Sequence, residues 1–359
     1  MTQRLVIVGT RLFDHPPVAL IADKHPEYLS AKLARARAAS QPVALIEVQH
    51  HHAHVAACLA ENLYPLDAAP ALGIVLDGLG WGDDGTIWGG EFLLADYRSY
   101  ERLGLFKPVA MLGGAQAARE PWRNLYAHLM AEIGWAELKM NFTELELFAD
   151  LARRPRATLD AMSHNGVNAP KASSCGRLFD AVAAALNLCR DRQAYEGEAA
   201  ARLEAIVDRE AMLGDHEELA YPFSIPNMRD SGLPYIEPLA MWRAILGDLI
   251  LGTPAALMAA RFHKGLAKIV VTMASKLAAR DDQGGGARFE TIALSGGCFQ
   301  NRVLFEEVVR GLEREGFRVL THAQVPANDG GLALGQAAIG AARLIDGANM
   351  CDNAQPIMG

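Results

Sequence analysis

Short apolar runs alternate along the chain with longer segments in which apolar residues recur at helical spacing. The short runs are rich in Val, Ile and Leu, which is typical of buried strands. They lie at Arg4–Val8, Val43–Val48, Leu72–Leu76, Thr291–Leu294 and Phe317–Leu320. A further segment of β-type composition, Thr86–Tyr97, follows an Asp-Asp-Gly turn, so we predict a hairpin there.

The longer segments have the spacing of amphipathic helices. They lie at Glu120–Ile133, Glu144–Arg153, Asp180–Cys189, Gly197–Val207, Ala255–Arg280 and Gly331–Leu344. Strands followed by helices throughout the chain predict an α/β architecture in which helices cover a mainly parallel sheet.

Proline and glycine residues cluster near Lys107–Gly114 and again near Asn165–Gly176, which predicts two boundaries. The domain organisation that follows is a first α/β lobe, a helical insertion, a second α/β lobe and a loose tail. These parts cover residues 1–110 (completed by a C-terminal helix over 328–345), 111–175, 176–327 and 346–359.

Composition excludes several classes of protein. Hydrophobic residues make up 51% of the 359 residues, enough to bury a core, so a disordered chain is excluded. We find neither an apolar run of membrane-spanning length nor a secretory signal, and we expect a cytoplasmic protein without a membrane partner. The net charge of −8 argues against nucleic-acid binding by this chain alone, because such binding requires clustered Lys and Arg side chains. The five cysteines form no CxxC pair, so neither a disulfide framework nor a thiolate zinc site is expected.

Four histidines follow the strand at Val43–Val48, in the run His50-His51-His52-Ala53-His54. If His50 begins a helix, His50 and His54 lie one turn apart on the same face, where two imidazoles can bind one metal ion. The remaining ligands must come from elsewhere in the chain. The alternatives are a solvated or capping run of histidines and a core histidine whose hydrogen bonds are satisfied by the backbone.

Glycine-rich junctions follow two predicted strands and precede a helix. Such junctions let backbone N–H groups approach an anion, so we predict a phosphate held in a cleft between the lobes. They lie at Asp77-Gly78, Ser295-Gly296-Gly297 and Asn328-Asp329-Gly330. Asp77 and Asp329 would face the cleft, and with two histidines they make a nitrogen and oxygen site suited to iron or zinc. Asp180 either caps the helix that follows it or holds a ribose or base hydroxyl.

Seven strings in this order carry a resemblance over residues 20–345: VQHHHAHVAACLAEN, LDGLGWGDDGTIWGGEF, EPWRN, SSCGRLFDAV, YEGEAAARLE, LSGGCFQNR and PANDGGLALGQA. They resemble the C-terminal transferase domain of HypF, the carbamoyltransferase of hydrogenase maturation. That domain is similar to the tRNA threonylcarbamoyl transferases and to antibiotic O-carbamoyltransferases. The resemblance implies the two-lobed fold of sugar kinases, actin and chaperone ATPases.

The resemblance also implies roles for individual residues. It places one divalent or trivalent metal ion, iron or zinc, on His50, His54, Asp77 and Asp329. His50, His54 and Asp329 would be catalytic. It places ATP or carbamoyl adenylate against Gly78, Asp180, Gly197 and Asn301, with the loop Ser295-Gly296-Gly297 at the phosphate.

The implied activity is transfer of a carbamoyl group from carbamoyl adenylate to the C-terminal cysteine thiolate of HypE, for synthesis of the hydrogenase cyanide ligand. HypF proteins usually carry acylphosphatase, zinc-finger and YrdC-like domains as well, and none is found in this sequence. We therefore expect a YrdC-like domain or a full-length HypF to supply carbamoyl adenylate.

Four alternatives remain open from the sequence. Two are a tRNA threonylcarbamoyl transferase and a small-molecule O-carbamoyltransferase. The third is a non-catalytic subunit that binds a nucleotide and docks HypE or a full-length HypF, and the fourth is a sugar or acyl kinase.

Overall fold

The computed structural model describes residues 17–213, 220–279 and 289–352. It confirms the α/β class: eight strands form one mixed sheet, and helices cover both of its faces. The predicted strand at Arg4–Val8 lies outside the described residues.

The main sheet has the strand order β10-β9-β3-β4-β5-β8. These strands are Arg318–Leu320 (β10), Thr291–Ser295 (β9), Ala71–Trp81 (β3), Ile87–Ala95 (β4), Tyr100–Phe106 (β5) and Tyr235–Ile236 (β8). Two short strands, Val109–Ala110 (β6) and Lys171–Ala172 (β7), pair at its side.

The predicted hairpin at Thr86–Tyr97 is correct, because β3 and β4 pair antiparallel across the Asp-Asp-Gly turn. The expectation of a mainly parallel sheet is met only in part, because the sheet is mixed: β8 is parallel to β5 and β7 is parallel to β4, but the central strands are antiparallel. β4 is antiparallel to both β3 and β5, whereas β9 is parallel to β3 and β10. The three antiparallel strands follow one another directly in the sequence, so short turns suffice to connect them.

The sheet crosses the predicted lobe boundaries. Strands β3 to β5 lie in the predicted first lobe and β9 and β10 in the predicted second lobe, yet β3 and β9 are neighbours in one sheet. A second, two-stranded parallel sheet pairs β1 (Ala19–Asp23) with β2 (Ala44–Val48), and helix α2 (Leu29–Ser40) connects them.

Side chains of β3 alternate between two cores, as the period of a strand requires. Leu72, Ile74 and Leu76 point into the larger core, which most of the helices complete. These helices are α4 (Pro121–Glu132), α8 (Cys175–Ala185), α9 (Glu198–Ala205), α11 (Leu239–Ile250), α12 (Ala255–Ala279) and α13 (Arg302–Arg314). Ala71 and Val75 point into the smaller core, with helices α3 (His50–Glu61) and α14 (Leu332–Asp352).

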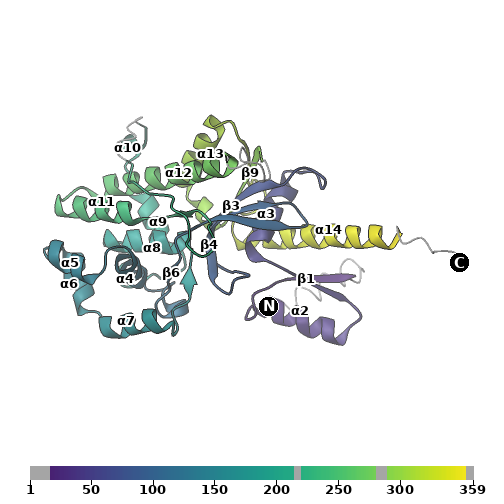
Figure 1. Cartoon of the computed structure of the whole chain (residues 1–359), viewed down its shortest axis with the longest axis horizontal. Helices are drawn as coiled ribbons and strands as arrows, with labels where there is room; N and C mark the ends of the chain where they lie inside the picture. Colours follow the sequence, from purple (N-terminus) through teal and green to yellow (C-terminus); the bar gives the residue numbers. More distant parts are fainter. Residues whose placement is uncertain (1–16, 214–219, 280–288, 353–359) are drawn as a thin grey trace.

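Figure 1 shows a group of short helices at the left end of the molecule, whereas α14 extends to the right and β1 and α2 lie below it. The short helices are α4, α5 (Trp135–Asn141), α6 (Glu146–Arg153) and α7 (Arg156–Asn165), all within the predicted insertion. The remaining elements are α10 (Arg209–Leu213) and the short 3-10 helices η1 (Gly114–Gln116), η4 (Gly297–Gln300) and η5 (Asp329–Gly331).

Two predicted element boundaries are wrong. Helix α8 begins at Cys175, before Asp180, because the Ser174 hydroxyl accepts the N–H of Arg177 and caps it. Helix α14 continues to Asp352, so residues 346–352 are helical where a loose tail is predicted. None of the helices within the described ranges has the length and apolarity that a membrane crossing requires.

Candidate metal centre and nucleotide cavity

The histidine run begins helix α3, so the i, i+4 spacing places His50 and His54 on one face, as binding of a single metal ion requires. Gln49 caps the helix by accepting the N–H of His52, and the first ten residues of α3 are buried. His50 and His54 therefore lie one turn apart at the buried N-terminal end, with ring centroids 5.1 Å apart. His52 instead faces the carbonyl of Asp96, with its Nε2 at 2.7 Å, and His51 contacts the Gln49 amide through Nδ1.

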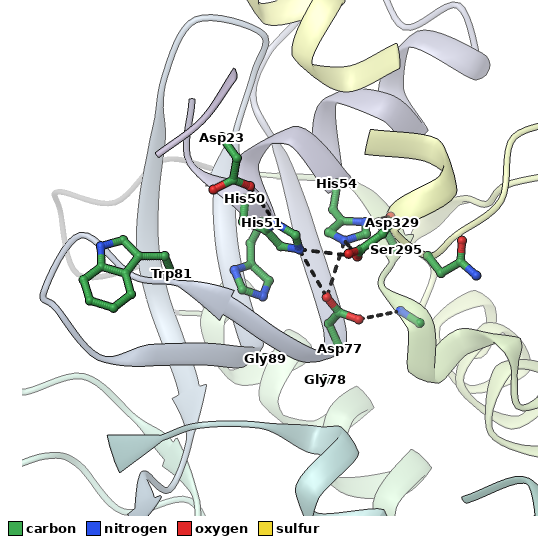
Figure 2. A network of polar contacts seen from close by, with 12 residues as sticks. Asp23, His50, His51, His54, Asp77, Gly78, Trp81, Gly89, Ser295 and Asp329 are labelled. Carbon is green, nitrogen blue, oxygen red and sulfur yellow. Dashed lines mark hydrogen bonds and ion pairs between the residues drawn. The ribbon is translucent and has the colours of Figure 1, made fainter. Parts of the chain in front are cut away.

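Asp77 and Asp329 complete a group of four side chains (Figure 2). Asp77 Oδ2 lies 3.5 Å from Nε2 of His50 and 3.5 Å from Nε2 of His54. Asp329 Oδ1 lies 3.5 and 3.6 Å from the same two nitrogens. One ligand atom from each residue falls within 4.8 Å of all the others. The structure thus brings together the two histidines and two aspartates that the sequence predicts as metal ligands.

The sheet edges explain why residues so far apart in the sequence meet. β3 and β9 run parallel with Val75 opposite Ser295, so Asp77 and Gly297 emerge at the same edge. There the Gly297 N–H donates to Asp77 Oδ1 at 3.0 Å, which leaves Oδ2 facing the histidines. Gly296 turns the chain at φ 102°, and a Cβ at this position would overlap the Leu76 carbonyl.

Among the described residues, Nε2 of His50 and Nε2 of His54 are buried and have no hydrogen-bond partner. A buried polar atom without a partner is costly, and a cation between the four side chains would satisfy both nitrogens. Two imidazole nitrogens and two carboxylate oxygens are a donor set that fits zinc or iron. The residues present therefore fit a metal ion.

The charges of the group are tightly coupled. Burial alone would lower the pKa of His50, but the carboxylates of Asp23, Asp329 and Asp77 outweigh it and raise that pKa well above 6.5. The pKa of His54 is likewise raised, because Asp329 and Asp77 outweigh its burial. In turn, His50 and His54 outweigh the burial of Asp77 and hold its pKa well below the usual value.

Asp23 is a residue of this site that the sequence reasoning missed. Its Oδ2 lies 2.7 Å from Nδ1 of His50, and both side chains are buried. Because a carboxylate accepts, Nδ1 of His50 carries the proton and Nε2 faces the metal group. Asp23 ends β1, which runs parallel to the strand before His50. The apolar run Ala19–Ala22 was the available signal, since it resembles the runs that were identified as strands.

A cavity of about 650 Å³ adjoins the metal group. Both aspartates of the metal group, Asp77 and Asp329, line it. Most of the other residues predicted to contact a nucleotide line it too: Gly78, Asp180, Gly197, Gly297 and Asn301. Tyr28 and Arg177, which the sequence reasoning did not identify, also line it.

Asp180 and Arg177 form a buried charged pair on the cavity wall. Arg177 Nε lies 2.8 Å from Asp180 Oδ2, and both side chains are at least 95% buried. Burial raises the pKa of Asp180 to about 6, although Arg177 opposes the shift. Asp180 lies inside α8, so it does not cap that helix, and the alternative role as an N-cap is wrong.

The remaining predicted contacts are engaged with the protein itself. Asn301 Oδ1 accepts the N–H of Leu304 as the cap of α13, and its Nδ2 lies 2.8 Å from Nε2 of His263. Ser295 and Gly296 are not among the described residues that line the cavity. The hydroxyl of Ser295 is buried against His54 and His322, so the predicted contact of Ser295 with a phosphate has no support in its position.

Comparisons with known proteins identify the family of the chain. A family model described as "Carbamoyltransferase, Kae1-like Domain, second subdomain" matches residues 73–336, and one described as "HypF Kae1-like domain" matches residues 3–61. "Carbamoyltransferase HypF" of Rhodobacter capsulatus is 43% identical over 338 residues, which cover 93% of this chain and 40% of that protein. "Carbamoyltransferase HypF homolog" of Cupriavidus necator is 37% identical over 91% of this chain and 79% of its own length.

A solved structure described as "full-length HypF in the phosphate- and nucleotide-bound form" superposes with a TM-score of 0.80 and 31% identity, covering 95% of this chain and 41% of that one. The chain thus spans about 40% of several of its HypF relatives and most of the Cupriavidus homolog. The resemblance predicted from the sequence is confirmed: the chain belongs to the family of Kae1-like carbamoyltransferase domains of HypF proteins.

Proposed function

We propose that this domain transfers a carbamoyl group from carbamoyl adenylate to the C-terminal cysteine thiolate of HypE, for cyanide ligand synthesis in hydrogenase maturation. The supporting observation is that a single cavity of this carbamoyltransferase-family chain is lined both by the metal group, through Asp77 and Asp329, and by residues predicted to bind the nucleotide, such as Asp180 and Gly197. A cavity of about 650 Å³ is within the range of ordinary small-molecule sites.

The nucleotide would lie against Gly78, Asp180 and Gly197. Gly197 has φ 86° and is the N-cap of helix α9, so the backbone can approach the ligand there without a side chain in the way. Asp180 would accept hydrogen bonds from sugar hydroxyls, and Arg177 would hold its carboxylate in place. A similar solved structure is described as a phosphate- and nucleotide-bound form of full-length HypF, which supports a nucleotide as a ligand of this family.

The metal group would hold one iron or zinc ion through His50, His54, Asp77 and Asp329. A cation bound there supplies Lewis-acid polarisation of a carbonyl or phosphoryl oxygen. The chain orients the ligands in advance, since Asp23 fixes the ring of His50 and the Gly297 N–H fixes the carboxylate of Asp77.

The nucleophile would come from the acceptor protein. Cys298 is the only thiol among the described residues that line the cavity, and its contact with Cys175, together with burial, raises its pKa well above 9.0. A protonated thiol is a poor nucleophile. The thiolate of the acceptor would attack the carbonyl carbon, forming a C–S bond. The bond from that carbon to the phosphate oxygen breaks, and AMP leaves with the electron pair.

Carbamoyl adenylate would come from a YrdC-like domain or from a full-length HypF. A cytoplasmic location stays a prediction from the sequence.

The direct test supplies synthetic carbamoyl adenylate and purified HypE to this chain, with mass spectrometry of the HypE C-terminal peptide as the readout. We expect a carbamoylated cysteine with the wild-type chain and none with His54→Ala. His52→Gln is the matched control, because it lies on the same helix turn but faces Asp96. Nucleotide binding without transfer to HypE would favour the non-catalytic alternative.

A further inference from the structure

A continuous hydrogen-bonded chain of side chains leads away from the metal group through His54. Its Nδ1 lies 3.2 Å from Ser295 Oγ, and that oxygen lies 2.9 Å from Nε2 of His322. Nδ1 of His322 lies 2.9 Å from Oε2 of Glu61, the last residue of α3. Four side chains from three distant parts of the sequence thus connect without a break.

Glu61 is held as a carboxylate at the far end of this chain. Its Oε1 accepts the backbone N–H groups of Ala323, Gln324 and Val325. Burial would raise the pKa of Glu61, but these hydrogen bonds and the one from His322 outweigh burial and lower the pKa to about 2.

The charge of Glu61 determines the direction of every hydrogen bond in the chain. A carboxylate only accepts, so Nδ1 of His322 must donate to it. Burial lowers the pKa of His322, which keeps the ring neutral, so its Nε2 is an acceptor. Ser295 then donates to His322, and its oxygen is left to accept from Nδ1 of His54.

We propose that Glu61, acting through His322 and Ser295, is a positioning residue that keeps the proton of His54 on Nδ1 and leaves Nε2 free for the metal. The proposal rests on the proposed metal site. It gives His54 the same arrangement that Asp23 gives His50, but through two intervening side chains. Carboxylates that fix the far nitrogen of a metal-bound histidine typically contribute about ten- to hundredfold in metal affinity.

Glu61→Gln tests the direction of the hydrogen bonds between these side chains without removing any of the side chains. The Gln oxygen can still accept the three backbone N–H groups, whereas its NH2 group would donate to Nδ1 of His322. Nε2 of His322 then donates to Ser295. The hydroxyl of Ser295 has two acceptors within reach, Nδ1 of His54 at 3.2 Å and the Ala327 carbonyl at 3.4 Å, and donation to the nearer one moves the proton of His54 to Nε2. We expect zinc to bind about ten- to hundredfold more weakly. In metal-free protein, at a pH above the titration of His54, ¹⁵N NMR should report the Nε2–H tautomer in the variant and Nδ1–H in the wild type.

A double-variant experiment separates this role from a purely structural one. Ser295→Ala breaks the chain next to His54, so Glu61→Gln should have no further effect on zinc affinity in that background. Asn62→Ala is the matched control: its Nδ2 donates to the Thr321 carbonyl at the same helix end, outside the chain. We expect that variant to bind zinc like the wild type.

The proposal is overturned if Glu61→Gln keeps the wild-type tautomer and zinc affinity, or if its effect persists in the Ser295→Ala background. These results differ from failure of the metal site itself. If His54→Ala binds zinc as tightly as the wild type, the proposed metal site is wrong; if it loses zinc while Glu61→Gln does not, only the role of Glu61 is wrong.

Discussion

At the scale of single residues, the site depends on which nitrogen of each histidine carries the proton. Asp23 decides this for His50 through one buried hydrogen bond of 2.7 Å. Its other oxygen, Oδ1, accepts the N–H of His25 at 2.7 Å, so the carboxylate is held from two sides. A carboxylate held in this way cannot turn to leave Nδ1 without an acceptor.

Asp23→Asn should therefore weaken zinc binding by about ten- to hundredfold while leaving the fold intact. The amide has the same size, but its NH2 group placed against Nδ1 of His50 would force the proton to Nε2. Zinc titration by calorimetry and the circular dichroism spectrum together check this. A variant that folds and binds zinc with unchanged affinity would show that Asp23 has no part in the metal site.

The sequence predicts the residues that would bind the metal, but not the residues that orient those ligands through hydrogen bonds. His50, His54, Asp77 and Asp329 stand at the ends of predicted elements beside glycines or in a histidine run, and these are local signals. Glu61 and His322 carry no such signal, because they meet only after α3 packs against the segment that follows β10. Their contact spans 261 positions in the sequence, and no periodicity encodes it.

At the scale of elements, the absence of a side chain at Gly335 allows helix α14 to pack closely against α3. A Cβ on Gly335 would overlap the carbonyl oxygen of Ala53 and lie 2.8 Å from the backbone nitrogen of Ala57. Both neighbours are backbone atoms of a buried helix, so no side chain can move aside. The helix also begins directly after η5, which carries Asp329, so its position determines where that ligand lies.

Gly335→Ala should destabilise the protein by about 1–3 kcal/mol through overpacking and also weaken zinc binding, because Asp329 would shift. Urea denaturation and zinc titration check the two effects. Gly347→Ala is the matched control in the same helix, since a Cβ there has no neighbour within 4 Å. It should leave zinc affinity unchanged and stability unchanged or slightly higher, because alanine favours a helix over glycine. Equal stability of the two variants would contradict the packing argument.

The element predictions failed where direction or capping mattered. Apolar runs identified β2, β9 and β10 within one residue and the first half of β3, because burial in a strand produces the same pattern in either orientation. The same pattern does not show whether neighbouring strands run parallel or antiparallel, so it does not reveal that β4 is antiparallel to both β3 and β5; no strand is predicted at β5. The predicted start of α8 is too late because apolar spacing alone does not reveal that the Ser174 side chain caps the helix.

At the scale of the whole molecule, the metal group joins three parts of the chain, α3, β3 and η5, that the sheet and helices bring together. Without a metal, two buried histidines and two aspartates hold the group together by charge. The folded-state pKa of His50 and of His54 is raised above 6.5, so their contribution to stability is present below that pH and is lost as pH rises through the folded values. The pKa of Asp77 is lowered, so its contribution is present above 3.8 and lost as pH falls further.

Zinc should therefore stabilise the protein more as pH rises above neutrality. The metal must replace a proton on each histidine, so its affinity increases as those protons are lost. At zinc concentrations about 100-fold above the dissociation constant, the gain would be about 2.7 kcal/mol. Thermal melts with EDTA and with zinc across this pH range measure it, and His54→Ala should abolish the difference. A gain from zinc that is independent of pH, or one that His54→Ala retains, would place the bound zinc somewhere other than this group.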